Sequence, residues 1–260
     1  MATQLEGNLV EVFWSAQGEG SFVGSPTVFV RFGGCDLRCR WCDSPHTWKQ
    51  GAVCRFESAA GTQRFTTEPN PISLDRILES IDDLQPQKGC FVSLTGGEPL
   101  LQPALALAIA QASQDKGRRT HLETHGLAVA SLETVLPSID LVAMDWKLSA
   151  DVKPAVRDSP SPDDFERLHR AFLEKAARGA SVCVKVVITP DTQAEDLDPI
   201  CRSLTEVAPG ASLILQPMTG HRLTELEPSS EQLMSLLRHC AARVEDVRLI
   251  PQTHKVYGAL

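Results

Sequence analysis

The 260-residue sequence lacks the features that would place the protein in a membrane or on a nucleic acid. No uninterrupted apolar run approaches the roughly 20 residues that a membrane-spanning helix needs. The first residues, MATQLEGNLVEVFW, contain neither the charged zone nor the apolar zone of a secretory signal. Positive charge is not in excess, since 25 basic residues face 33 acidic ones and the net charge is −8. We therefore expect a cytoplasmic protein that has neither nucleic acid nor an anionic membrane as its main partner.

Closely spaced cysteines are also missing from most of the chain. Cys54, Cys90, Cys183, Cys201 and Cys240 stand far apart and form no CxxC pair. In a reducing compartment, isolated cysteines are seldom disulfide-bonded, and they behave as small hydrophobic side chains. We expect these five to be buried thiols and not a second cluster.

The other three cysteines lie together in one loop, within the stretch FVRFGGCDLRCRWCDSPHTW (residues 29–48). Three residues separate Cys35 from Cys39, and two separate Cys39 from Cys42. Three thiolates this close in sequence can converge on one metal centre. The residues alone leave three candidates open: a structural zinc ion completed by His46, a cluster that only carries electrons, and a 4Fe-4S cluster with one open iron.

Strand-like and helix-like segments alternate from about residue 73 onward. Strands are expected at 9–13, 26–32, 90–95, 119–126, 140–148, 181–189, 212–218 and 246–251, and helices at 74–84, 101–117, 131–137, 164–178, 194–207 and 230–242. This alternation predicts right-handed βα units and a mainly parallel sheet. The units are too few for a closed eight-fold barrel, so we predict an α/β fold with an open, partial barrel in a single domain, residues 1–260. The polar stretch 49–70 shows no convincing period, and its length indicates an insertion, at about 50–70, or a mobile lid.

Polar, glycine or proline residues follow the predicted strands. The cysteine loop follows Phe32, and the motifs TGGEP, ETHG, DWK, ITP, QPM and PQTHK follow the later strands. In folds of this kind, chemistry collects at the carboxyl ends of the strands. We therefore expect the cysteine loop and these motifs to surround one site.

Two motifs together resemble the radical S-adenosylmethionine (SAM) superfamily. Cys35, Cys39 and Cys42 match its CxxxCxxC motif, Trp41 matches the aromatic residue before the third cysteine, and residues 95–99 read TGGEP. The resemblance implies a partial TIM barrel, the radical SAM core, with a 4Fe-4S cluster whose open iron is chelated by SAM. An electron from the cluster would then cleave SAM and release a 5′-deoxyadenosyl radical.

Further motifs resemble one family of that superfamily, the 7-carboxy-7-deazaguanine synthases. The motifs QGEG, FVRFGGC, CDS, TGGEP, LETHG, QPM and QTHK occur in the family's order over nearly the whole chain. The resemblance implies a carbon–nitrogen lyase that converts 6-carboxy-5,6,7,8-tetrahydropterin to 7-carboxy-7-deazaguanine with release of ammonia, in queuosine or deazapurine biosynthesis. The alternatives are a radical SAM enzyme with another substrate and a non-catalytic iron–sulfur or zinc protein.

The resemblance also implies roles for individual residues. Substrate contacts are expected from Ala16, Gln17, Gly18, Glu19, Arg31, Thr95 and Leu260. Cofactor contacts are expected from Trp41, Cys42, Asp43, Gly97, Glu98, Glu123, Thr124, Lys147 and Gln216, and a Mg²⁺ contact from Ser44. Arg31 would hold the substrate carboxylate with its planar fork, and Glu19 would accept two parallel hydrogen bonds from the pterin. Without the resemblance, Glu19 is compatible with a solvated loop acid and Lys147 with a surface lysine.

The resemblance extends to partners. A reductant such as a flavodoxin is expected, and the arginines beside Cys39 are the place where an acidic donor would dock. A homodimer is expected as well, since an incomplete barrel leaves apolar surface to cover.

Overall fold

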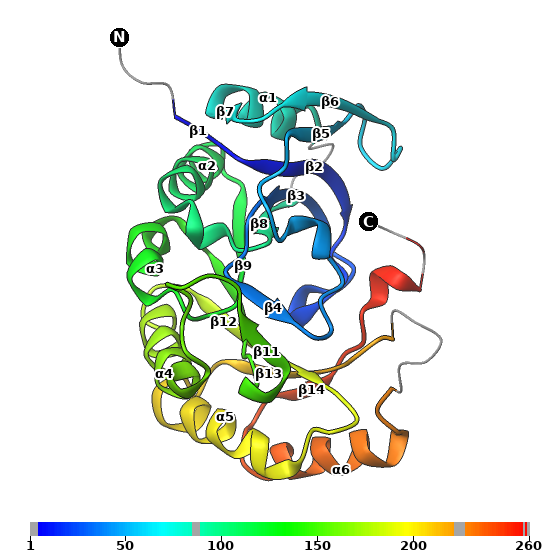
Figure 1. Ribbon diagram of the computed structural model, residues 1–260, viewed down its shortest axis with the longest axis vertical. Coiled ribbons are helices and arrows are strands. Elements are labelled where there is room, and N and C mark those ends of the chain that lie inside the picture. The colour runs from blue at the N-terminus through cyan, green and yellow to red at the C-terminus, as the bar shows by residue number, and fades with distance from the viewer. Residues whose placement is uncertain (1–4, 85–88, 221–226, 257, 259–260) are drawn as a thin grey trace.

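The computed structural model describes residues 5–84, 89–220, 227–256 and 258. Its centre is one ten-stranded sheet with the order β14-β13-β12-β10-β9-β8-β3-β2-β5-β6 (Figure 1). The strands are β2 (Leu9–Ala16), β3 (Pro26–Phe32), β5 (Val53–Glu57), β6 (Phe65–Pro69), β8 (Phe91–Gly96), β9 (Arg119–Thr124), β10 (Leu141–Asp145), β12 (Ser181–Ile188), β13 (Ser212–Pro217) and β14 (Val247–Leu249). From β3 to β14 all neighbouring strands are parallel, whereas β2 runs antiparallel to β3.

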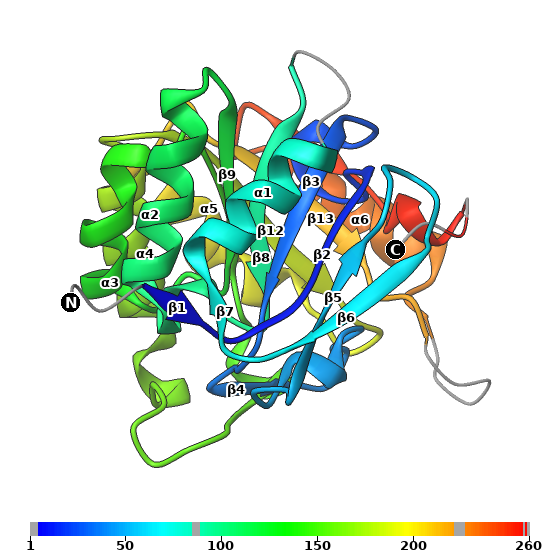
Figure 2. The same cartoon turned by 90° about the horizontal axis from the view of Figure 1, so that it is seen from above.

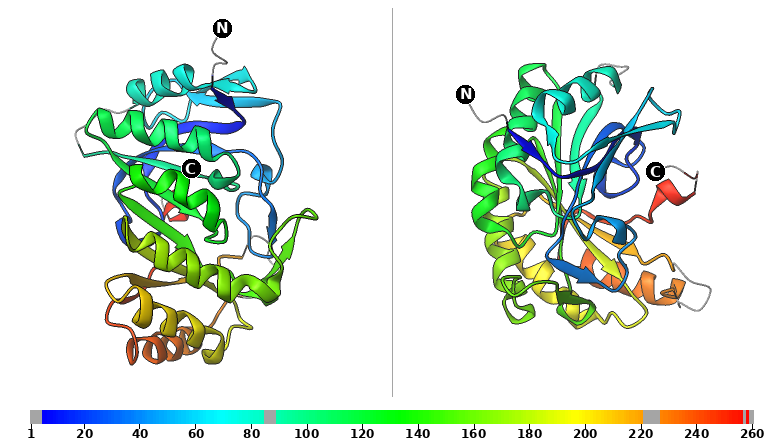
Figure 3. Two further views of the ribbon diagram at one scale, coloured as in Figure 1. Left: turned by 90° about the vertical axis from the view of Figure 1, so that its left-hand side faces the viewer. Right: turned by 45° about the horizontal axis from the view of Figure 1, so that its top comes forward.

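Six helices follow the strands and cover the outer face of the curved sheet (Figure 1; Figure 3, left). They are α1 (Leu74–Leu84), α2 (Pro103–Asp115), α3 (Val129–Val135), α4 (Phe165–Ala176), α5 (Ala194–Val207) and α6 (Ser230–Ala241). Their apolar faces carry fully buried side chains such as Ile77, Ile109, Leu132, Phe172 and Ile200. The open, mainly parallel partial barrel predicted from the sequence is thus confirmed. Among the described helices, none is long and apolar enough to cross a lipid bilayer.

Two small sheets complete the fold. Strand β1 (Glu6–Gly7) pairs with β7 (Ile72–Ser73) at the start of α1. Strand β4 (Leu37–Cys39), inside the cysteine loop, pairs antiparallel with β11 (Val152–Pro154). This second pairing fixes the cysteine loop over the concave side of the large sheet.

The stretch 49–70, expected as an insertion or a mobile lid, has regular secondary structure. It forms the antiparallel hairpin β5–β6, which extends the large sheet beside β2 (Figure 2). Strand β6 is the edge of the sheet, and its residues Thr66 and Thr67 are exposed, which explains why no apolar pattern marked it. Cys54 in β5 is fully buried.

The five isolated cysteines are all buried. Cys54, Cys90, Cys183, Cys201 and Cys240 are each at most 2% exposed, which confirms that they serve as small core side chains.

Candidate active site

A cavity of about 470 Å³ lies on the concave side of the sheet, at the carboxyl ends of the parallel strands. Its walls include the following residues singled out from the sequence: Ala16, Gln17, Gly18, Glu19, Arg31, Cys35, Cys39, Trp41, Cys42, Asp43, Ser44, Thr95, Gly97, Glu123, Thr124, Lys147 and Gln216. Leu260 lies outside the described residues. No residue of the stretch 51–70 lines the cavity.

The cysteine loop reaches the cavity because its backbone is held at several points. Gly34, with a φ of 99°, turns the chain, donates from its N–H to the carbonyl of Thr47 at 2.8 Å and accepts from the N–H of Glu98 at 2.9 Å. Leu37 is buried and packs near Phe165 in a small apolar cluster. A Cβ added to Gly97 would lie 2.1 Å from the carbonyl oxygen of Gly34, so this position requires glycine.

The three thiols facing the cavity have the chemistry of metal ligands. Burial raises the pKa of Cys35 to about 12 and also raises the pKa values of Cys39 and Cys42. Thiols in such a place ionise when a metal supplies positive charge. Unlike the buried thiol of Cys54, the three thiols lie on one cavity, so a metal centre bound there could take all three as ligands.

Their spacing distinguishes a cluster from a single zinc ion. Ligand atoms around tetrahedral zinc, at about 2.3 Å from the metal, lie about 4 Å from one another. Within the described parts of the chain, no three of Cys35, Cys39, Cys42 and His46 bring their ligand atoms within 4.8 Å of one another. In an iron–sulfur cluster each cysteine binds a different iron, so the sulfurs stand further apart. The spacing of Cys35, Cys39 and Cys42 therefore fits an iron–sulfur cluster.

Glu98 does not line the cavity, although a contact with the cofactor was expected from it. It is completely buried beneath the cavity wall. Its carboxylate accepts hydrogen bonds from the hydroxyl of Thr124 at 2.9 Å and from the N–H of His125 at 2.9 Å. Glu98 therefore holds the end of β9 in place, and its contact with the cofactor stays a prediction.

Glu123 is the centre of a hydrogen-bond network at the floor of the cavity. Its carboxylate accepts from Gln17 Nε2 at 2.9 Å, from Ser93 Oγ at 2.8 Å and from Thr95 Oγ1 at 2.7 Å. Glu123 thus links Gln17 and Thr95, two of the residues expected to contact the substrate. Sequence reasoning missed Ser93 and His121, although each stands two residues before a residue that it had identified and so points to the same face of its strand.

Arg31 has an acidic partner that the sequence did not indicate. Its Nε donates to Glu11 Oε1 at 2.8 Å, and Arg55 donates to the other oxygen of Glu11 at 2.7 Å. The guanidinium also lies over the ring of Phe13, 5.2 Å from the ring centroid. Arg31 is therefore held on the cavity wall and does not face outward from its strand.

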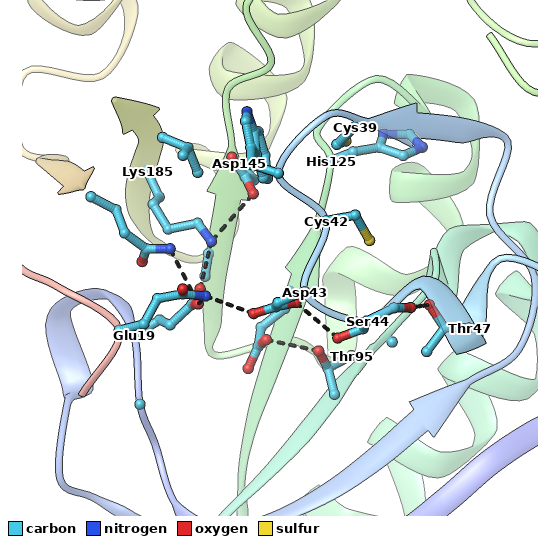
Figure 4. Close-up of a pocket in the computed structure, with 18 of the residues that line it drawn as sticks. Glu19, Cys39, Cys42, Asp43, Ser44, Thr47, Thr95, His125, Asp145 and Lys185 are labelled. Carbon is cyan, nitrogen blue, oxygen red and sulfur yellow. Dashed lines mark hydrogen bonds and ion pairs between the residues drawn. The ribbon is translucent and has the colours of Figure 1, made fainter. Parts of the chain in front are cut away.

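A chain of alternating charges crosses the opposite wall (Figure 4). Lys147 Nζ lies 2.6 Å from Asp145 Oδ2, Lys185 Nζ lies 3.2 Å from the same oxygen, and Lys185 Nζ lies 2.5 Å from Glu19 Oε2. Burial alone raises the pKa of Glu19, but Lys185 outweighs it and lowers that pKa to about 2. Burial likewise lowers the pKa of Lys185, yet Asp145 and Glu19 hold it well above its ordinary value. Glu19 is therefore ionised and paired.

The carboxyl-terminal segment closes one side of the cavity. Gln252 Nε2 donates to Glu19 Oε1 at 2.7 Å and to Asp43 Oδ2 at 2.6 Å, and the N–H of Thr253 donates to the carbonyl of Gly18 at 2.9 Å. A Cβ added to Gly18 would lie 2.2 Å from the ring of His254, so the glycine of QGEG leaves room for this segment.

Asp43 and Ser44 continue the rim. Ser44 Oγ donates to Asp43 Oδ1 at 2.9 Å. Ligand atoms of Glu19, Asp43 and His254 all lie within 4.8 Å of one another. Close acidic groups are common without an ion, so this cluster by itself assigns no metal.

Three buried polar atoms on the cavity wall lack a partner among the described residues: His121 Nε2, Asp145 Oδ1 and Gln216 Oε1. A buried polar atom without a partner costs about 1–3 kcal/mol. Together with the side chains of Glu19, Arg31, Thr95 and Lys147, these atoms make the cavity wall polar. The cavity therefore fits polar molecules, as a nucleoside and a pterin are.

Comparison with known proteins agrees with this geometry. The model of the radical SAM superfamily matches residues 29–204. The 7-carboxy-7-deazaguanine synthase of Geobacter sulfurreducens is 32% identical over 97% of this chain and 97% of its own length, and that of Methanopyrus kandleri is 36% identical over 96% and 92%. The crystal structure of QueE from Escherichia coli superimposes with a TM-score of 0.60 at 21% identity, covering 96% of this chain and 95% of that one, and so supports the fold.

Proposed function

This chain belongs to the radical SAM superfamily and, within it, to the 7-carboxy-7-deazaguanine synthases, and we propose from that premise how its residues carry out the reaction. The reaction is the conversion of 6-carboxy-5,6,7,8-tetrahydropterin to 7-carboxy-7-deazaguanine with release of ammonia. One observation carries the proposal: the three thiols, the QGEG residues and Arg31 all face one cavity of about 470 Å³.

Cys35, Cys39 and Cys42 hold the 4Fe-4S cluster, and SAM occupies the adjoining part of the cavity. Once bound, the cluster and SAM supply the carbon-centred radical chemistry of the superfamily. The chain binds SAM through Gly97, Trp41 and Lys147, with further contacts from Asp43, Glu123, Thr124 and Gln216. Support comes from the position of Lys147, whose Nζ lies 4.3 Å from the ring centroid of Trp41. A side chain only 7% exposed at this place is poorly explained as a surface lysine.

The pterin is bound by the other half of the cavity. Arg31 binds the substrate carboxylate, and Glu11 orients the guanidinium by holding its Nε. Glu19 accepts hydrogen bonds from the guanidine-like edge of the pterin, which requires the ionised carboxylate that Lys185 maintains. Gln17, Thr95 and the backbone of Ala16 and Gly18 line the remaining surface, and Leu260 stays a prediction.

Mg²⁺ is bound at Ser44. Magnesium usually takes one or two protein ligands and keeps water or substrate oxygens, so a single hydroxyl is sufficient. The carboxylate of Asp43, 2.9 Å from Ser44 Oγ, adds negative charge beside it. A Ser44→Ala protein should need several-fold more Mg²⁺ for half-maximal activity, and an unchanged dependence on Mg²⁺ would remove the assignment.

A small acidic carrier such as a flavodoxin would supply the electron, and the chain acts in the cytoplasm as a homodimer. Arg40, about half exposed next to Cys39, is already paired with Asp151 and Asp191, so an acidic carrier docking on this side would compete with these two carboxylates.

One assay tests the function. The reconstituted protein is incubated without oxygen with the carboxytetrahydropterin, SAM, Mg²⁺ and a reductant, and deazaguanine, ammonia and 5′-deoxyadenosine are measured. We expect all except free 5′-deoxyadenosine to accumulate, since SAM is regenerated in this family. If 5′-deoxyadenosine forms without a deazaguanine, the protein acts on another radical substrate. A colourless protein with stoichiometric zinc would overturn the proposal entirely.

A further inference from the structure

Lys185 is the one residue of the charged wall whose importance the sequence gave no reason to suspect. It lies in the middle of β12, within the run SVCVKVVI, and its side chain is only 15% exposed. The neighbouring residues Val184 and Val186 pack into the core, so the alternation of the strand turns Lys185 toward the cavity. A buried ammonium group is costly unless it is paired. Here it has two carboxylate partners, Glu19 and Asp145.

These two partners belong to different halves of the cavity. Glu19 comes from the QGEG loop, on the side assigned to the pterin. Asp145 shares its Oδ2 between Lys185 and Lys147, and Lys147 stands over Trp41 on the side assigned to SAM. Lys185 is thus a charged connection between the two halves through this wall, beside the hydrogen bond that Gln216 donates to Glu19 (Figure 4).

We propose that Lys185 is a positioning residue that couples the binding of the pterin at Glu19 to the binding of SAM at Lys147. The proposal rests on the proposed function and deepens it. It predicts that each ligand strengthens the binding of the other, because such coupling is reciprocal.

Counting lone pairs shows what a pterin must displace at Glu19. The two oxygens of a carboxylate accept about four hydrogen bonds in total. Among the described residues, Glu19 Oε2 accepts from Lys185 and keeps one lone pair, while Oε1 accepts from both Gln216 and Gln252. Two parallel bonds to a pterin, one to each oxygen, therefore require Gln216 or Gln252 to move away, while Lys185 governs how much negative charge Oε2 presents.

Asp145 decides how strongly Lys185 is held at Glu19. While Lys147 neutralises Asp145, Lys185 interacts more closely with Glu19, at 2.5 Å compared with 3.2 Å to Asp145. When a ligand carboxylate attracts Lys147, the ammonium group of Lys147 moves away from Asp145. Asp145 then interacts more strongly with Lys185. Lys185 then shifts toward Asp145, and Glu19 becomes a stronger acceptor for the pterin because less of its negative charge is neutralised.

The test measures binding, so it does not depend on turnover. Because the cluster stays unreduced, SAM is not cleaved, and 6-carboxypterin serves as an unreactive probe. The Kd of 6-carboxypterin is measured by calorimetry with and without saturating SAM. In the wild-type protein we expect SAM to tighten pterin binding by about tenfold. In Lys185→Met the ratio should fall to about one, and in Lys185→Arg it should be partly retained because the positive charge remains.

Two matched variants separate coupling from loss of affinity or of folding. Arg31→Met removes another cation that faces the pterin, but it contacts Glu11 and not the charged chain. It should weaken pterin binding while the effect of SAM stays tenfold. Lys116→Met removes a lysine paired with Asp82 on the surface and should change neither value. Circular dichroism and the iron content establish that each variant is folded and loaded.

The outcomes are distinct. Coupling that survives Lys185→Met, or a wild-type protein that binds both ligands independently, overturns this inference and leaves the proposed function in place. A wild-type protein that does not bind 6-carboxypterin overturns both.

Discussion

The two faces of the central sheet are built from the same strands but hold opposite chemistry. In β12, Val184 and Val186 are fully buried beneath the helices, whereas Lys185 faces the cavity. In β10, Val142 and Met144 face the core, while Asp145 faces the cavity. The convex face is apolar and closely packed, and the concave face holds paired charges and unsatisfied polar atoms.

This difference separates stability from function. Burial of apolar area under the helices is the main stabilising contribution, because it scales with the area removed from water. The charges on the concave face cost desolvation energy and are retained only where partners compensate for them. Substitutions on the convex face should therefore lower stability, and substitutions on the concave face should lower activity. Four predictions test that separation.

The largest effect should come from comparing two cysteines. Cys39→Ala should abolish cluster binding and product formation, because three thiolates are needed to hold the cluster. Cys54→Ala, on the convex side, should retain both. Iron content and the deazaguanine assay measure the outcome. A Cys39→Ala protein that keeps its full iron content would show that Cys39 does not bind the cluster.

Two adjacent residues of β8 give the next test. Leu94 is fully buried against the helices, so Leu94→Ala should lower the free energy of unfolding by about 2–5 kcal/mol. Thr95 donates to Glu123, and Thr95→Val should lower kcat/KM about tenfold or more because a hydrogen bond to a charged group is lost. Urea unfolding and steady-state kinetics measure the two. If Leu94→Ala lowered activity and left the free energy of unfolding unchanged, the convex face would not be the face that determines stability.

A buried histidine within α4 provides a pH test. Burial lowers the pKa of His169 to about 3, against an ordinary value of 6.5. Below pH 6.5, His169 therefore binds a proton in the unfolded chain but not in the folded protein. The free energy of unfolding falls as the pH falls. At pH 5 the loss from this group should be about 2 kcal/mol.

The matched variant is His169→Phe, which keeps an aromatic ring against Trp146 and cannot titrate. Between pH 7 and 5 its unfolding free energy should fall less steeply than that of the wild type, whatever its stability at pH 7. Equal slopes would mean that His169 is protonated in the folded protein.

The smallest effect is expected on the solvent side of the helices. Arg167 pairs with Asp164 at 2.8 Å, but both side chains are largely exposed. Arg167→Ala should change the unfolding free energy by less than about 1 kcal/mol and leave activity unchanged. A larger change in thermal denaturation would show that this pair contributes more than exposed pairs usually do.

The sequence was informative wherever a local pattern carried the signal. Helix α1 was predictable because Ile77 and Ile81 recur on one face, and the cysteine loop because its spacing serves one chemistry. The hairpin β5–β6 was not, since its edge strand has exposed threonines and no alternation. The burial of Glu98 was not predictable either, because adjacency to Gly97 in sequence does not reveal that its carboxylate is buried against Thr124 and His125.

The sequence by itself therefore determined the strand–helix alternation, the loop of three thiols and the motifs that gather at the strand ends, because each depends on residues close together in the chain. Only the tertiary structure decided which charges meet. Lys185 and Glu19 are 166 residues apart, and Gln252 and Glu19 are 233 apart. Their contacts depend on the order and curvature of the strands, which bring distant side chains to one concave face.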